Sequence, residues 1–259
     1  MIIKIPFSAG SLGKNKECSL APDAILSELN SCYTKEELRQ VKPEVKELRV
    51  DSSNIEKSFS LIEQYIAGIS NKFIALGGDH SISYPILKGF STRHRNFCLL
   101  VFDAHPDVMQ SFQPPTHEDW LRVLVEQEIV KPNGVVMVGI RNPHIAEIEF
   151  IKRNGLRIFT MKHCFELGVK QLTSVIMENC KPFNAIYMSI DIDAIDPAFA
   201  PGTGYIEPGG FTSREFLHMI QRISLLKNLQ GVDIVEVNPS RDINKLTVRL
   251  AARLLSELL

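Results

Sequence analysis

Two aspartates and a histidine lie within five residues, at positions 103–107 (Asp-Ala-His-Pro-Asp). They follow the apolar run 97–102, which is short, uncharged and typical of a buried parallel strand. Side chains alternate along a strand, so Asp103 and His105 point to the same side. The proline that follows cannot donate to a strand ladder, which lets the chain turn and bring Asp107 back. Such a group indicates a metal site, or else a polar turn that caps the next helix.

Similar polar groups follow two other apolar runs. Residues 189–197 (Ser-Ile-Asp-Ile-Asp-Ala-Ile-Asp-Pro) place Asp191 and Asp193 on one side of a predicted strand. Residues 77–81 (Gly-Gly-Asp-His-Ser) end a third run. Open α/β sheets place their sites at the carboxyl ends of strands. Several charges at the edge of a core require counter-ions, so together the three groups favour a metal site over helix capping.

The charge of the candidate ligands favours two divalent ions. Four aspartates carry four negative charges, which two such ions balance, and the two histidines bind as neutral ligands. A single tetrahedral zinc takes only three or four protein ligands. Six suit two bridged ions about 3.5–4 Å apart. Mixed carboxylate and imidazole ligands favour manganese, with iron, cobalt or nickel as substitutes. The candidate ligands are His80, Asp103, His105, Asp107, Asp191 and Asp193.

These motifs resemble those of the ureohydrolase superfamily, which includes arginase, agmatinase and formiminoglutamase. Order and rough spacing match as well as residue type, and the likeness spans nearly the whole chain. The start of the chain, at 5–8 and 21–23, resembles the family's first strand and loop. The other matching segments are 77–81, 103–107, 189–197, 201–204 (Pro-Gly-Thr-Gly), 207–210 (Glu-Pro-Gly-Gly) and 233–239 (Asp-Ile-Val-Glu-Val-Asn-Pro).

The rest of the chain alternates short apolar runs with helical stretches, which predicts a parallel sheet covered on both faces. The resemblance implies a three-layer α/β/α fold with an eight-stranded, mostly parallel sheet, as in the arginase and histone-deacetylase group. We expect one domain over 1–259. A last helix is predicted from near Ile243. Strands are predicted near 2–6, 46–50, 72–76, 97–103, 134–140, 156–159, 184–191 and 231–237, with helices between them such as 54–69, 82–92, 120–129 and 143–154.

The composition excludes several classes of protein. A net charge of −1 gives no basic patch for nucleic acid. No apolar stretch approaches the roughly 20 residues that a membrane-spanning helix needs, and the first residues lack the features of a signal peptide. The five cysteines form no Cys-x-x-Cys pair, which is typical of a reduced compartment. We therefore expect a cytoplasmic protein without nucleic-acid or membrane partners.

The resemblance also implies roles for the candidate ligands. Asp103 and Asp191 would bridge the two metals. The remaining ligands would each bind one ion only. The first ion would be held by His80, Asp103, Asp107 and Asp191, and the second by Asp103, His105, Asp191 and Asp193.

Three further residues are candidates for substrate binding and proton transfer. The resemblance implies that Glu236 binds the guanidinium or amidine of the substrate, since a carboxylate fork matches a planar cation; the alternative is a carboxylate paired with a local lysine or arginine. Thr203 would also contact substrate. His117 lies 12 residues after His105, where agmatinase-like members carry a histidine, and would shuttle protons. The alternative for His117 is a helix-start residue, and its neighbour Glu118 replaces the usual glycine.

The implied activity is manganese-dependent hydrolysis of a C–N bond other than a peptide bond in a linear, cationic amidine or guanidino compound. The amine would leave with a proton from Asp193 or His117. Met109 and Tyr205 replace residues common in arginases, which favours an agmatine-type substrate. Arginase and formiminoglutamase remain alternatives, the latter requiring a nearby cation.

Candidates for that cation are Arg122 and Arg141. The polar segment 110–115 is a candidate active-site loop. Family members are usually trimers or hexamers, so a homo-oligomer formed by the body of the domain rather than by a C-terminal tail is expected. A different class of function, a non-catalytic metal-binding scaffold on the same fold, is also open.

Overall fold

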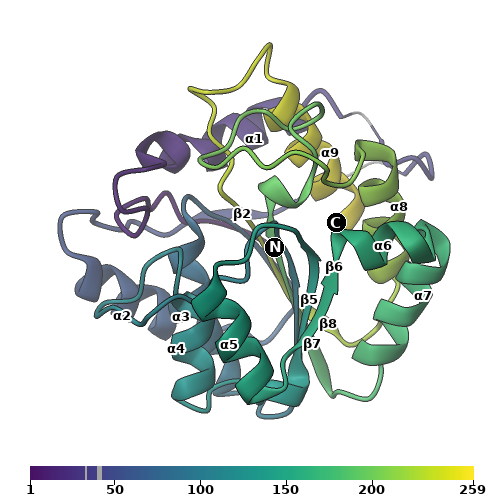
Figure 1. Cartoon of the computed structure of the whole chain (residues 1–259). Coiled ribbons are helices and arrows are strands. Elements are labelled where there is room, and N and C mark those ends of the chain that lie inside the picture. The colour runs from purple at the N-terminus through teal and green to yellow at the C-terminus, as the bar shows by residue number, and fades with distance from the viewer. Residues whose placement is uncertain (33, 40–42) are drawn as a thin grey trace.

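The computed structural model describes residues 1–32, 34–39 and 43–259. Its sheet has eight strands, all parallel, in the order β2-β1-β3-β8-β7-β4-β5-β6 (Figure 1). Each predicted strand overlaps one of these, which confirms the predicted α/β fold class. The strands are β1 (Ile2–Lys4), β2 (Val45–Glu47), β3 (Phe73–Leu76), β4 (Phe97–Phe102), β5 (Val135–Ile140), β6 (Arg157–Thr160), β7 (Ala185–Asp191) and β8 (Leu229–Val235).

Helices cover both faces of the sheet (Figure 1). Two hydrophobic clusters, one on each face, hold the layers together, and β3, β4 and β5 are apolar along their whole length. One face is covered by α2 (Ile55–Ala67), α3 (Ser83–Ser91), α4 (Trp120–Glu126) and α5 (Ile145–Asn154). The other is covered by α1 (Ala21–Leu29), α6 (Met161–Leu167), α7 (Val169–Cys180), α8 (Ser213–Ile223) and α9 (Leu246–Leu258).

Two local predictions differ from the structure. Residues 21–23 begin α1 instead of forming a loop, with Pro22 in the first turn, where a missing N–H costs nothing. The last helix begins at Leu246, after Ile243, because Asn244 and Lys245 have positive φ angles of 50° and 59°. The carboxylate that precedes this turn, Asp242, accepts the backbone N–H groups at 243, 247 and 248.

The strand order brings the polar segments of the sequence together. The connection from β3 to β4 runs through α3 on one face, whereas β7 and β8 are reached through α7 and α8 on the other face. As a result β8 and β7 lie between β3 and β4. The carboxyl ends of these four neighbouring strands share one edge of the sheet, where a change in the direction of the connections opens a crevice.

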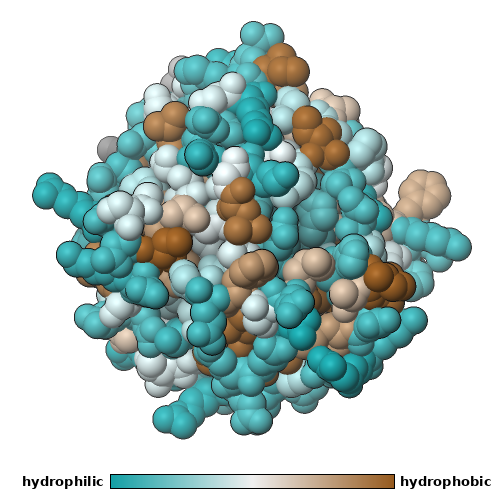
Figure 2. All heavy atoms as spheres, turned by 60° about the vertical axis from the view of Figure 1, so that its left-hand side comes forward, coloured by the Kyte–Doolittle hydropathy of each residue, from teal (hydrophilic) through white to brown (hydrophobic). Residues whose placement is uncertain are grey.

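The surface shows mixed polarity. The face drawn in Figure 2 is mainly hydrophilic, with hydrophobic side chains in small separate groups. Hydrophobic side chains scattered over a surface in this way are normal for a folded protein. Within the described ranges, no helix is long and apolar enough to cross a membrane.

Candidate metal centre

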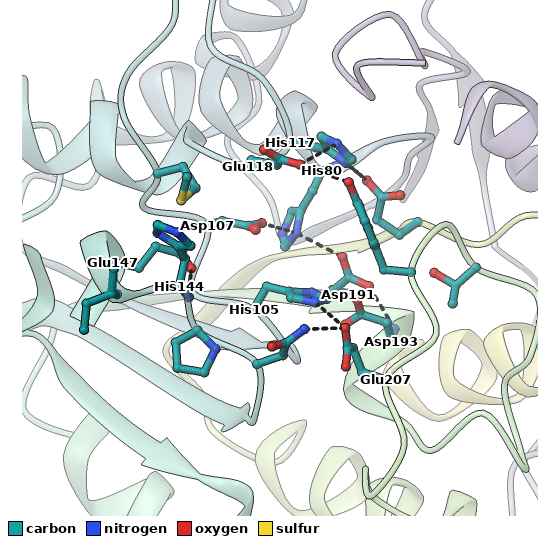
Figure 3. A pocket seen from close by; sticks show the side chains of 17 residues that line it. His80, His105, Asp107, His117, Glu118, His144, Glu147, Asp191, Asp193 and Glu207 are labelled. Atoms are coloured by element: carbon teal, nitrogen blue, oxygen red, sulfur yellow. Dashed lines mark hydrogen bonds and ion pairs between the residues drawn. The ribbon is translucent and has the colours of Figure 1, made fainter. Parts of the chain in front are cut away.

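The side chain of His80 lies among three carboxylates, two that follow β4 (Asp103 and Asp107) and one that ends β7 (Asp191). Figure 3 shows His80 beside Asp107 and Asp191. His80 begins the short 3₁₀ helix η2 (His80–Ile82) after β3. Its Nδ1 atom lies 3.2 Å from Asp103 Oδ2, 3.0 Å from Asp107 Oδ2 and 3.2 Å from Asp191 Oδ2. All four side chains are buried. This arrangement presents one nitrogen and three oxygens to a common point.

A second group lies beside the first. His105 Nδ1 is 3.1 Å from Asp193 Oδ2 and 3.6 Å from Asp103 Oδ1. The two oxygens of Asp103 therefore face the two histidines, and this carboxylate belongs to both groups, His80–Asp103–Asp107 and Asp103–His105–Asp193, in which the potential ligand atoms lie within 4.8 Å of one another. Of the two histidines, only His80 contacts the Asp191 carboxylate among the described residues, at 3.2 Å. The structure thus brings together all six predicted ligands and places Asp103 between two candidate ion positions.

The backbone at this edge adopts unusual conformations. Asp107 has a φ angle of 53°, which folds the chain back after Pro106 as the sequence predicts, and Glu236 has a φ angle of 63°. Residues other than glycine adopt such angles only where the surroundings impose them, and these positions cluster at functional sites. Asp191 Oδ1 accepts the N–H of Asp193, which holds the turn into the 3₁₀ helix η4 (Ile192–Ala194).

The chemistry of this cluster fits cations. His80 Nδ1 and Asp103 Oδ2 are buried and have no hydrogen-bond partner among the described residues, although buried polar atoms are normally paired. Burial raises the pKa of Asp107 to about 7, and the neighbouring charge of Asp103 adds to the increase. Burial, with the charges of Asp193 and Asp103, also raises the pKa of Asp191 well above its ordinary value. Carboxylates that resist ionising together are stabilised by ions bound between them.

A chain of hydrogen bonds fixes the orientation of His80. Ser189 Oγ lies 2.8 Å from His80 Nε2 and donates to Asp233 Oδ1 at 2.6 Å. Tyr187 and Ser83 donate to Oδ2 of the same carboxylate at 2.7 and 2.8 Å. Because Ser189 donates its proton to Asp233, its lone pair accepts the Nε2–H of His80, and Nδ1 is left free to ligate. The segment 233–239 was identified from the sequence, but this role of Asp233 was not.

Replacing Ser189 with alanine is expected to weaken Mn²⁺ binding by about 10- to 100-fold, the usual effect of losing a partner that orients a metal-binding histidine. The measurement is the Mn²⁺ dissociation constant of the purified variant. Ser83→Ala is the matched control, since it also removes one buried hydroxyl from Asp233, but that hydroxyl makes no hydrogen bond to the His80 ring. Equal Mn²⁺ affinity in the two variants would refute the orienting role of Ser189.

Trp120, at the start of α4, contacts two members of the same cluster. Its indole Nε1 donates to Asp107 Oδ2 at 2.7 Å, and its ring packs on the His80 ring at a centroid distance of 4.6 Å. The side chain is fully buried. From the sequence, Trp120 is predicted only as the start of a helix, because a tryptophan 13 residues from its partner has no recognisable ligand spacing.

Glu236 follows β8 and lies next to the cluster, where it is already engaged. Its Oε1 accepts the His80 N–H at 2.8 Å and lies 3.2 Å from His117 Nδ1, while Asn15 Nδ2 donates to Oε2 at 2.6 Å. A carboxylate has about four acceptor positions, so three are in use and one remains on Oε2. The paired carboxylate considered as an alternative is thus present, but the partners are His117 and Asn15 instead of a lysine or arginine.

His117 is buried and does not start a helix. Its N–H donates to Gly10 O at 3.1 Å, and α4 begins three residues later. Burial lowers its pKa, but the hydrogen bond and the charge of Glu236 more than offset this and raise it to about 9. The Nε2 atom has no partner among the described residues. At neutral pH this imidazolium therefore donates to Glu236 through Nδ1, and its Nε2–H is free to donate to a ligand.

A cavity of about 500 Å³ opens onto the cluster. Thr203, Tyr205 and His117 line it, and Thr203 Oγ1 is buried without a partner in the described chain. His144, which has no ligand-like spacing in the sequence, lines the cavity as well (Figure 3). The prediction for 110–115 is wrong: none of these residues lines the cavity, and 111–115 line a separate hollow beside α2 and α3.

Neither of the two candidate arginines lines the cavity. Arg122 pairs with Glu126 at 2.8 Å on the surface of α4. Arg141 donates to the backbone oxygens of Asp193 and Glu207, each at 2.6 Å. Arg122 is therefore held in an ion pair, and Arg141, although it contacts the backbone of Asp193, directs its guanidinium at backbone oxygens. Among the described residues, neither arginine offers a positive charge on the cavity lining for a substrate carboxylate.

Known proteins resemble this chain in both sequence and structure. The profile of the arginase family matches residues 1–259. The agmatinase of Bacillus subtilis (strain 168) is 33% identical over 212 residues, which cover 80% of this chain and 70% of the relative. The guanidinobutyrase of Pseudomonas aeruginosa is 32% identical over 223 residues, covering 83% and 69%. The crystal structure of formimidoylglutamase from Bacillus subtilis superposes with a TM-score of 0.92 at 29% identity, covering 99% and 84%. The names of these relatives point to different substrates.

Proposed function

Because the chain belongs to the arginase family, we propose that it is a manganese-dependent hydrolase with two metal ions and an agmatine-type guanidino substrate, releasing urea and an amine. The observation that carries this proposal is the buried cluster of four aspartates and two histidines, with unpartnered atoms of His80 and Asp103 at its centre. The cluster lies at the inner end of a cavity of about 500 Å³, which has room for a small linear substrate.

The roles we propose for the ligands follow their positions. Asp103, with one oxygen toward each histidine, would be shared by the two ions. Asp191 would be the second shared ligand. When bound, two Mn²⁺ ions lower the pKa of water so that hydroxide is available near neutral pH. His80 and Asp107 would complete the first ion's protein ligands, and His105 and Asp193 those of the second.

The protein's other residues would bind the substrate and move protons. The free acceptor position on Glu236 would receive one N–H of the substrate's guanidinium, and Thr203 Oγ1 is a further polar partner. His117 would donate the Nε2 proton to the departing amine and then take up a proton from solvent. Asp193 is the alternative donor, since in the described structure its Oδ1 accepts one N–H, that of Ala104 at 3.0 Å, and since Asp193 lines the cavity as His117 does.

The choice of substrate rests on charge. Arginine and formiminoglutamate both carry a carboxylate, which an enzyme binds with a cationic side chain. Arg122 and Arg141 are not part of the cavity lining, so we favour a substrate without a carboxylate over the arginase and formiminoglutamase alternatives. Manganese as the native ion, a cytoplasmic location and a trimer or hexamer remain predictions from the resemblance.

The test is urea release by the Mn²⁺-loaded protein from agmatine, arginine, 4-guanidinobutyrate and guanidine, with ammonia or formamide release from formiminoglutamate measured in parallel. Agmatine is expected to give the highest kcat/KM. A protein that binds two Mn²⁺ ions but hydrolyses none of these compounds would support the non-catalytic scaffold and contradict the proposal.

A further inference from the structure

The walls of the cavity beyond the metal cluster carry negative charge. Among the residues that the structure describes, no lysine or arginine lines this cavity. The acidic side chains outside the six candidate ligands are Glu118, Glu147, Glu207 and Glu236. A cavity of this kind attracts cations and repels carboxylates.

Three of these glutamates have other partners. Glu147 closes the capping box of α5 by accepting the His144 N–H at 2.8 Å, and it also accepts the Val108 N–H. Glu236 accepts three hydrogen bonds at the cluster. Glu207 lies 3.3 Å from His105 Nε2 and accepts from Asn142 at 2.6 Å, so it orients a candidate ligand. None of these roles requires a substrate.

Glu118 is different. Its only side-chain hydrogen bond comes from the hydroxyl of Tyr205, which donates to Oε1 at 3.0 Å. In the described part of the chain it has no lysine or arginine partner, its one charged neighbour is His117 at 4.0 Å from Oε1, and its side chain is 35% exposed at the cavity. Figure 3 shows Glu118 beside His117, on the side of the cavity away from Glu207. One carboxylate oxygen is thus held by the protein and the other is available to a ligand.

The position of Glu118 is fixed by its own loop. Its backbone oxygen accepts the Met109 N–H at 3.0 Å, and Asp119 accepts the backbone N–H groups of Phe112 and Thr116, each at 2.7 Å. The Tyr205 ring that holds its carboxylate packs between His105 and His117 at centroid distances of 5.5 and 5.8 Å. A carboxylate held in this way loses little entropy when it binds a cation.

The neighbouring histidine gives independent evidence of a ligand. His117 is 4% exposed, lines the cavity, and has an Nε2 atom without a hydrogen-bond partner in the described structure. This atom lies 4.0 Å from Glu118 Oε1, whereas Nδ1 of the same ring faces Glu236. The two carboxylates are therefore on opposite sides of the His117 ring, one by the metal cluster and one farther out along the cavity.

We propose that Glu118, held by Tyr205, binds a second positive charge on the substrate, an amine at the end remote from the guanidinium. This inference rests on the proposed guanidino hydrolase activity and narrows it to dicationic substrates. Met109, Pro143 and Ile145 line the same cavity and supply apolar surface for the methylene chain that joins the two charges. Glu118 would then set specificity without contacting the reacting atoms.

The experiment compares three guanidines of similar length with the Mn²⁺-loaded protein. Agmatine carries an amine at its far end, n-butylguanidine carries a methyl group there, and 4-guanidinobutyrate carries a carboxylate. The parent protein is expected to prefer agmatine over n-butylguanidine by at least about 10-fold in kcat/KM, because hydrogen bonds between charged groups are among the strongest in binding. 4-Guanidinobutyrate is expected to be the poorest of the three.

The variant Glu118→Gln should reduce the agmatine preference to within about threefold, since it removes the charge and keeps the side chain's shape. Tyr205→Phe should reduce it partly, because it frees Glu118 without removing it. The matched control is Glu149→Gln, which changes the net charge equally on the exposed side of α5, away from the cavity, and should preserve the preference.

Hydrolysis of n-butylguanidine and agmatine with equal kcat/KM by the parent protein would overturn this inference and leave the proposed function standing. An unchanged preference in Glu118→Gln would also overturn it. Urea release from none of the three guanidines would overturn the proposed function and this inference with it.

Discussion

Replacing Asp103 with asparagine is expected to lower urea release by at least about 10³-fold. Its two oxygens face His80 at 3.2 Å and His105 at 3.6 Å, so the substitution removes the negative charge shared by both candidate ion positions. Bound metals contribute several kcal/mol of charge stabilisation in such sites, and each 1.4 kcal/mol corresponds to a factor of ten in rate. The measurements are kcat for the best substrate and the number of Mn²⁺ ions bound per chain.

The same substitution has opposing effects on the metal-free protein. Burial raises the pKa values of Asp107, Asp191 and Asp193, and the charge of Asp103 adds to the increase. In spite of burial, contacts with His105 and His80 hold the pKa of Asp103 itself well below its ordinary value, so kcat and the number of bound ions are the properties to compare. Asp51→Asn, on an exposed turn, is the control and should leave both properties unchanged. Parental urea release by Asp103→Asn would refute the shared-ligand assignment.

Replacing His117 with asparagine is expected to lower kcat by about 10²- to 10⁴-fold, the usual contribution of a general acid or base. None of the six candidate ligands is changed, so two Mn²⁺ ions should still bind. The effect should fall on kcat more than on KM, because the expected contact with the guanidinium is made by Glu236, which keeps its hydrogen bonds from Asn15 and from the His80 N–H.

The pH dependence of kcat gives a second test of the same variant. The pKa of His117 is raised from 6.5 to about 9 by Glu236, in spite of burial. The imidazolium is therefore the donor at pH values below about 9 and loses its proton as the pH rises through that value. The parent's kcat should fall above about pH 9, and His117→Asn should lack this fall. A kcat within about threefold of the parent, with the alkaline limb retained, would assign proton transfer to Asp193 instead.

The sequence predicted the metal-ligand cluster well because each ligand can be recognised from residues close to it in the chain. Each group of ligands follows an apolar run directly, so the strand end and the side of the strand could both be read from neighbouring residues. The convergence of these ends depends on the order β3-β8-β7-β4. The sequence did not predict that order, since the resemblance implied only an eight-stranded, mostly parallel sheet.

The supporting residues could not be predicted because their partners are distant in the chain. Asn15 reaches Glu236 across 221 residues, and Ser189 reaches Asp233 across 44. The pairing of Tyr205 with Glu118 joins two loops 87 residues apart. The loop prediction failed for a related reason. Asp119 folds 112–116 back on itself, so the residues that face the cavity are the two that follow this segment, His117 and Glu118.

The measurement that tests the central claim most directly is a Mn²⁺ titration of the metal-free protein, with bound metal and urea release from agmatine followed together. The account predicts no urea release without metal, and activity that rises with added Mn²⁺ and reaches its maximum at two ions per chain. Full activity in the metal-free protein, or saturation with two ions without any urea release, would contradict it.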